Sequence, residues 1–245
     1  MPAYSWFLSL HAVAGTLALV TFWLAALLRK GSPRHRLSGR VYLLSMVAVI
    51  VSAVPLAVQR LIDGDQVIAA FLGYLVVITA TGVWGAWRAV GDKHDVVRYT
   101  GPVFVALGLL SVASGLGVLL LGVRAGAPLL IGFSTVGLLN GGAMLLKRLR
   151  RDRLAERPRW WLVEHYSQMV GNGVATHIAF LALGLPRLLP AIDGVALHYT
   201  AWFGPLLVAT LAKLWLDHHW KPRARRRADT QTSASVGQPS PVPRL

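Results

Sequence analysis

Seven long apolar segments, separated by short polar connections, make up most of the chain. Each has the length of roughly 18 residues or more that an α-helix needs to cross a bilayer. A soluble core cannot bury so many segments of this kind, so the pattern predicts an all-α, polytopic membrane protein with seven transmembrane helices. We expect these helices at about residues 6–28, 41–62, 67–88, 101–122, 128–146, 161–188 and 195–216.

The sixth segment is apolar in bulk but contains several polar residues. Polar groups at membrane depth are unfavourable towards lipid and usually face protein or a cavity. On a helix that turns by about 100° per residue, one set of side chains falls on a single stripe about 100° wide. The stripe consists of His165, Gln168, Met169, Asn172 and Thr176. His177 lies about 120° from His165 and points elsewhere. We therefore expect the other helices to pack around this one.

Lysine and arginine are distributed unevenly along the chain. The first, third and fifth connections and the C-terminal end carry 22 of them, and the other connections carry only Arg60, Arg124 and Arg187. By the positive-inside rule, this asymmetry predicts an N-terminus outside and a C-terminus inside, in the inner (cytoplasmic) membrane of a cell. The net charge of +15 is then explained by orientation and by anionic headgroups at the cytoplasmic face. Nucleic acid is not an expected partner.

The two ends of the chain lead to a division into two parts. A secretory signal peptide requires basic residues before its apolar segment. No basic residue precedes Trp6, so we expect an uncleaved first helix. Residues 1–220 are expected to form the transmembrane domain, and 221–245 a disordered, basic, cytoplasmic tail. Gly137 and Gly141 form a GxxxG motif in the fifth helix. It favours packing within the chain over a homodimer, which the sequence leaves open.

Two basic connections carry local predictions. In the first loop, Gly31, Pro33 and Gly39 predict that no helix continues through it. The arginines of this loop face lipid headgroups or, alternatively, bind an anion, a phosphate or a cofactor propionate. The connection after residue 146 is expected to extend the fifth helix until Pro158 ends it.

Histidines at matched depth are the candidate ligands for a cofactor. His11 in the first helix and His198 in the seventh lie near the outer face. His165 lies near the inner face, where Met46 or His35 could be its partner. Two axial ligands on facing helices are what a b-type haem requires. One hypothesis is therefore haem b, or another redox cofactor, between the first, sixth and seventh helices.

A metal site is an alternative use of these side chains. His11, His177 and His198 form a candidate set, because imidazole clusters bind zinc or iron. The simpler alternative for each histidine is a hydrogen bond to another helix. The chain has no cysteine, which excludes thiolate zinc sites, iron–sulfur clusters and c-type haem. Glu164 lies beside the inner basic residues and is expected to pair with an arginine.

Three functions remain in view at this stage. The first is a redox membrane protein that binds haem b or is linked to quinone. The second is a transporter or lipid-handling protein without redox chemistry, in which the stripe of the sixth helix lines a path. The third is a seven-helix metal hydrolase that uses histidine ligands.

Three stretches of the chain carry a family resemblance. They are His11 with Gly15; Lys30-Gly31, His35-Arg36, Gly39-Arg40-x-Tyr42 and Met46; and His165-x-x-x-Met169-x-Gly171 with Ala175 and Ala179-Phe180. Together they resemble an uncharacterised family of bacterial multi-pass membrane proteins, a domain of unknown function. The resemblance covers the first, second and sixth helices and implies fold and membrane location, but no established reaction. A similarity in plan also exists to ascorbate-reducible di-haem cytochromes b, which place histidines near both membrane faces.

Overall fold

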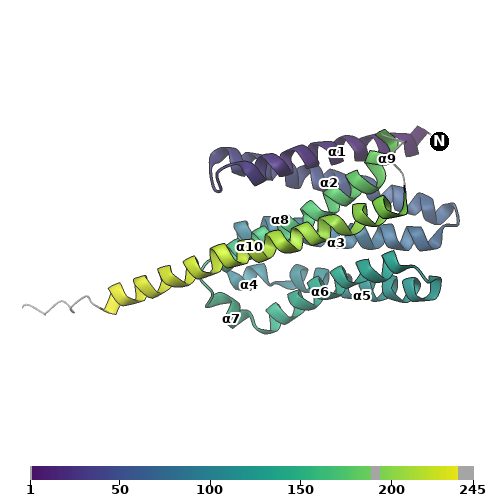
Figure 1. Cartoon of the computed structure of the whole chain (residues 1–245). Coiled ribbons are helices and arrows are strands. Elements are labelled where there is room, and N and C mark those ends of the chain that lie inside the picture. Colours follow the sequence, from purple (N-terminus) through teal and green to yellow (C-terminus); the bar gives the residue numbers. More distant parts are fainter. Residues whose placement is uncertain (1, 189–193, 237–245) are drawn as a thin grey trace, which may run out of the picture.

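The computed structural model describes residues 2–188 and 194–236, and no strand occurs in these two ranges. The chain forms a bundle of long helices with shorter helices at the connections (Figure 1). The helices are α1 (Pro2–Leu27), α2 (Pro33–Ile62), α3 (Gln66–Gly91), α4 (Val96–Tyr99), α5 (Pro102–Ala125), α6 (Pro128–Leu149), α7 (Arg151–Ala155), α8 (Trp160–Ile178), the π-helical η1 (Ala179–Gly184), α9 (Leu185–Leu188) and α10 (Val195–Val236).

Five helical segments are long and apolar enough to cross a membrane, within the described part of the chain. They are Tyr4–Leu27, Pro33–Ile62, Gln66–Gly91, Val96–Ala125 and Pro128–Leu149. Each overlaps one of the first five predicted spans, although the second begins at Pro33 and not at about 41, and the fourth begins at Val96 and not at about 101. Many of their large apolar side chains are exposed, as expected for helices that face lipid. The architecture is therefore that of an all-helical, multi-pass membrane protein.

The centre of the bundle is α3. It packs against α2, α5 and α8 and also contacts α6, whereas α8 packs mainly against α3, α10 and α1. The expectation that the other helices gather around the sixth predicted span is therefore wrong. The polar stripe faces a single main neighbour, and that neighbour is central. The connections α1–α2, α3–α5 and α6–α8 all lie at one end, which we call the basic end (Figure 1).

The basic end departs from prediction in its local structure. Helix α2 begins at Pro33, whose missing N–H is harmless in a first helical turn. The Ser32 hydroxyl caps this turn by accepting a hydrogen bond from the His35 N–H (3.2 Å). Pro33 therefore starts the helix, and Gly39 lies inside it, so the predicted break across the loop is wrong at both positions. Gly31, just before this helix, has a left-handed backbone, with φ at 79°.

The connection after α6 also differs from prediction. The predicted continuous extension stops at Arg150, and α7 follows as a separate short helix. Arg159 then takes a left-handed conformation with φ at 56° and leads into α8 at Trp160. Since this turn redirects the chain, α8 can pack back along α3.

The C-terminal helix is longer than the predicted span. It begins at Val195 and continues to Val236, past the boundary at 221 where the predicted disordered tail starts. Residues 237–245 lie outside the described residues. The sixth predicted span corresponds to three consecutive helical pieces, α8, η1 and α9.

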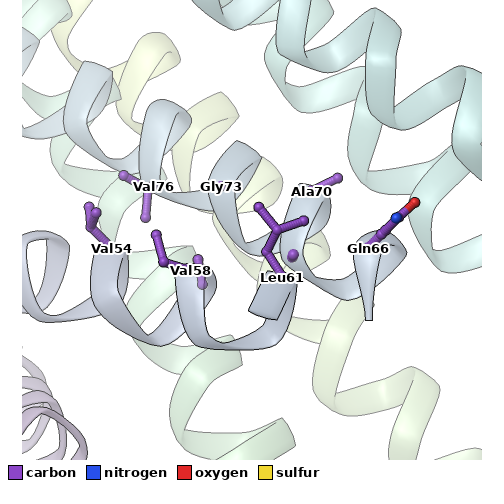
Figure 2. A pocket seen from close by; sticks show the side chains of 9 residues that line it. Val54, Val58, Leu61, Gln66, Ala70, Gly73 and Val76 are labelled. Atoms are coloured by element: carbon purple, nitrogen blue, oxygen red, sulfur yellow. The ribbon is translucent and has the colours of Figure 1, made fainter. Parts of the chain in front are cut away.

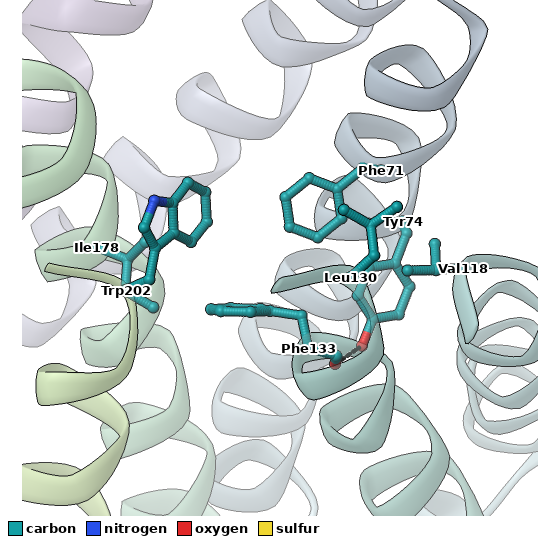
Figure 3. Close-up of a cluster of buried hydrophobic side chains, with 7 residues drawn as sticks. All are labelled: Phe71, Tyr74, Val118, Leu130, Phe133, Ile178 and Trp202. Atoms are coloured by element: carbon teal, nitrogen blue, oxygen red, sulfur yellow. Dashed lines mark hydrogen bonds between the residues drawn. The ribbon is translucent and has the colours of Figure 1, made fainter. Parts of the chain in front are cut away.

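The core at the end opposite the basic end is aromatic (Figure 3). Five helices contribute to its buried side chains: Phe71, Tyr74, Val118, Leu130, Phe133, Ile178 and Trp202. The Tyr74 hydroxyl donates a hydrogen bond to the Phe133 carbonyl (2.6 Å) and accepts one from the Gly137 N–H (2.8 Å). A side chain of α3 is thereby inserted between two residues of α6 that lie one helical turn apart.

Candidate functional site

The polar stripe of α8 lies in the interior. Gln168, Asn172 and Thr176 are buried. The Asn172 Nδ2 donates to the Gln168 carbonyl (3.1 Å), and the Thr176 hydroxyl donates to the Asn172 carbonyl (3.0 Å). The Thr176 hydroxyl also lies 3.2 Å from the Tyr42 hydroxyl and 3.4 Å from the Met46 sulfur. The Thr176 end of the stripe therefore also contacts α2, through hydroxyl and sulfur groups.

Small residues on α3 receive this stripe. A β-carbon at Gly82 would lie 2.8 Å from the carboxamide of Asn172, and one at Gly85 would lie 3.0 Å from Cγ of Gln168. The two helices approach closely because these positions lack side chains. The polar side chains of α8 thus fill the space over α3, and the predicted path along the stripe is occupied.

The imidazole of His165 is held at the basic end of this interface. Its Nδ1 lies 3.0 Å from the Ala86 carbonyl of α3. A carbonyl only accepts, so Nδ1 carries the proton, and in the neutral ring Nε2 keeps a free lone pair. A histidine oriented by a backbone carbonyl in this way is typical of ligands to metal or haem iron.

His35 is arranged in the same way. Its Nδ1 lies 2.9 Å from the Ala25 carbonyl near the end of α1, so its Nε2 is likewise the free position. His35 and His165 are close enough for their charges to interact. His35 and His165, two of the predicted inner ligands, therefore lie at the same end of the bundle, each oriented by a backbone carbonyl. Met46, the third, is buried, and its sulfur lies 3.4 Å from the Thr176 hydroxyl instead.

Lys30 completes the end of α1 beside His35. Its ammonium donates to the carbonyls of Ala25 (3.0 Å) and Ala26, which have no amide partner in a last helical turn. Partial burial lowers the pKa of the Lys30 ammonium. The Lys30 ammonium of the first loop is thus bound to backbone carbonyls at the end of α1.

The predicted outer pair is not assembled as expected. His11 Nδ1 lies 3.0 Å from the Ser52 hydroxyl of α2. His198 is exposed, and its ring contacts Tyr199 and Trp202 of its own helix. In the described ranges, α1 packs against α2 and α8, while α10 packs against α8 and η1. His11 and His198 were predicted at similar depth in the membrane, but their helices, α1 and α10, do not form one of these packed pairs.

His177 is engaged at both ring nitrogens. Its Nε2 accepts from the Trp23 indole (3.0 Å), and its Nδ1 lies 2.7 Å from the Gly173 carbonyl. No lone pair is left for a metal. Among the described residues, no group of three or more histidine or acidic side chains is placed to hold an ion. The predicted set of His11, His177 and His198 therefore receives no support as a metal site.

The ion pair of Glu164 lies nearby and has a different partner from the one predicted. Glu164 is buried and pairs with Lys147 of α6 (2.7 Å), and it accepts from the Tyr99 hydroxyl (3.2 Å). The expected arginine partner is wrong. Lys147 comes from the last turn of α6, and a residue of a distant helix cannot be chosen from the sequence among the many cations of this end.

Two hollows lie away from the histidines. One, of about 330 Å³, is a groove between α2 and α3 near their shared turn (Figure 2). Its lining is apolar apart from Gln66 and includes Val54, Val58 and Gly73. The other, of about 270 Å³, is cationic and lies at the start of α5.

Comparison with known proteins provides no relative from which a function could be transferred. No protein family, no curated protein and no solved structure matches the chain. The resemblance to an uncharacterised bacterial family therefore stays an expectation.

Proposed function

We propose that the chain is a seven-span protein of the inner membrane, with its N-terminus outside and its C-terminus in the cytoplasm, that carries a redox haem at its basic end. The orientation is supported by the 22 basic residues on one side and the three on the other. The sixth crossing would be the run α8, η1 and α9, and the seventh would lie within α10.

The observation that carries the haem proposal is the shared arrangement of His35 and His165. Each ring donates through Nδ1 to a backbone carbonyl and keeps Nε2 free, and the two rings are within electrostatic reach of each other. Two neutral imidazoles would hold the iron of a b-type haem, so the donor chemistry fits the group. When bound, the haem supplies reversible one-electron transfer.

The other residues of this end have supporting roles in the proposal. Ala25 and Ala86 orient the two imidazoles through their carbonyls. The arginines of the first loop would neutralise the propionates of a bound haem. A transport path is less well supported, because Asn172 and Gln168 fill the α3–α8 interface over Gly82 and Gly85.

The test is the absorption spectrum of the full chain, purified in detergent and titrated with haemin. We expect a Soret band and a sharp reduced α-band at one haem per chain. His35→Ala and His165→Ala should each abolish the low-spin spectrum. His94→Ala is the matched control, since His94 is an exposed histidine between α3 and α4, and it should leave the spectrum unchanged. A wild-type chain that gives no spectral shift would overturn the proposal.

A further inference from the structure

The cationic pocket at the start of α5 is built from two arginines and a helix N-terminus. Its lining is Trp84, Arg88, Arg98, Gly101, Pro102 and Val103, and its volume is about 270 Å³. It lies at the basic end, where α3 finishes and α4 leads into α5. The histidine site proposed above uses none of these residues.

The pocket carries an excess of positive charge. Asp92 is buried and forms ion pairs with Arg88 (2.6 Å) and Arg98 (3.4 Å). One carboxylate thus balances two guanidiniums, and the remaining charge has no anionic partner in the described residues. The Nε of Arg88 is buried without a hydrogen-bond partner there. The side chain of Arg98 is 66% exposed, so it is free to turn towards a ligand.

The helix start adds donors to the same pocket. Helix α5 begins after Gly101, and no side chain caps its first turn. Pro102 has no N–H, so the N–H groups of Val103 and Phe104 are the ones that lack intrahelical acceptors, and the positive end of the helix dipole lies beside the pocket. Two guanidiniums beside such a start form an arrangement that binds phosphate.

The surroundings keep the pocket shaped and place it at the membrane boundary. The guanidinium of Arg88 lies 6.0 Å from the ring of Trp84, which in turn stacks on Tyr99 at 6.0 Å. Arg88 is thus held between a ring and a buried carboxylate. Val97 and Val103 beside the pocket are exposed, which suits a position where acyl chains meet headgroups.

We infer that this pocket binds a phosphate group, with Arg98 as the residue that closes on it. An anionic phospholipid headgroup and a soluble phosphate share this chemistry. In the lipid case, the phosphodiester would meet Arg88 and Arg98 while the acyl chains run along Val97 and Val103.

The experiment uses the full chain in detergent and native mass spectrometry. Phosphatidylglycerol is titrated first, then phosphatidylcholine, and inorganic phosphate is tested separately. Arg98→Gln removes the charge and the fork of donors, and should weaken phosphatidylglycerol binding about tenfold. Lys93→Gln is the matched control, because Lys93 is an exposed cation of the same connection and does not line the pocket; its effect should be below about twofold.

Each outcome decides between the sources or against the pocket. Phosphatidylglycerol that stays bound to the wild-type chain and is lost from Arg98→Gln supports a site for a lipid headgroup. Competition by inorganic phosphate at millimolar concentration supports a soluble phosphate. Arg98→Lys should recover only part of the binding, because a lysine ammonium lacks the bidentate fork. Equal binding by wild type, Arg98→Gln and Lys93→Gln would overturn the inference.

Discussion

Gly82 of α3 lies directly against the Asn172 side chain of α8, so that a β-carbon at residue 82 would be 2.8 Å from both Oδ1 and Nδ2. Asn172 cannot withdraw easily, because its Nδ2 donates to the Gln168 carbonyl. The two helices are therefore fitted to each other at this position by the absence of a side chain. The contact joins the central helix to the polar stripe.

Gly82→Ala should destabilise the protein by about 1–3 kcal/mol, because the added methyl group overpacks a closed interface. The measurement is thermal unfolding of the purified protein in detergent. Gly73→Ala is the control in the same helix. Nothing lies within 4 Å of a β-carbon there, so it should be neutral or stabilising by about 0.5–1 kcal/mol. Equal melting temperatures for the two variants would contradict the described packing.

Tyr74→Phe should destabilise the protein by about 1 kcal/mol, because the ring stays buried while the hydroxyl bridge is lost. The loss stays modest since the Gly137 N–H and the Phe133 carbonyl can rejoin as a normal helical pair. Thermal unfolding measures it. Tyr199→Phe removes a hydroxyl from an exposed tyrosine and should change stability by less than about 0.5 kcal/mol. A larger effect at 199 than at 74 would be inconsistent with the inserted hydroxyl.

Lys147→Met should destabilise the protein by about 2–4 kcal/mol, because it leaves the Glu164 carboxylate buried without a cation. Glu164 is 5% exposed, so water cannot replace the ammonium. The double variant Lys147→Met, Glu164→Leu should recover most of the stability, since no unpaired charge remains. A double-mutant cycle in thermal unfolding gives the coupling. Additive effects of the two changes would argue against the pair.

Reporter fusions test the orientation. Fusions after Arg40 and Arg157 should report the cytoplasm, and fusions after Asp63 and Gly194 the outside, because the basic connections are retained inside. The fusion after Gly194 is the decisive one for the sixth crossing. A cytoplasmic signal there, with the other three as expected, would leave the first five spans in place and remove the sixth crossing.

The hydrophobic pattern was sufficient to locate the first five spans. Their length and composition depend on the segment alone, and the structure confirms that these helices are long and apolar enough to cross a membrane. Helix periodicity also placed Gln168, Asn172 and Thr176 on one face, and all three are buried. The face of a helix on which a residue lies depends only on the spacing of residues along that helix, which can be read from the sequence.

The sequence could not predict which helices are neighbours or which of their side chains contact each other. His11 and His198 are at similar depth in the sequence, yet His11 contacts Ser52 of α2, because neighbour order is decided by packing surfaces rather than by depth. The fit of Gly82 to Asn172 and the Lys147–Glu164 pair belong to this class. For His35 and His165, the sequence could not show that each Nδ1 lies against a backbone carbonyl of another helix, Ala25 and Ala86 respectively.

The π-helical segment η1, Ala179–Gly184, follows directly on α8 and holds more residues per turn than the helix before it. A chain shortened by one residue in this stretch can run as an uninterrupted α-helix from Trp160 onwards. The contacts of α8 with α3 would be unchanged, and α9 would keep nearly the same orientation, because the residue removed is the one that the π-helical turn adds. The segment is thus a place where chain length can vary by a single residue without penalty to the interface. Relatives of this protein should align across it with one-residue gaps.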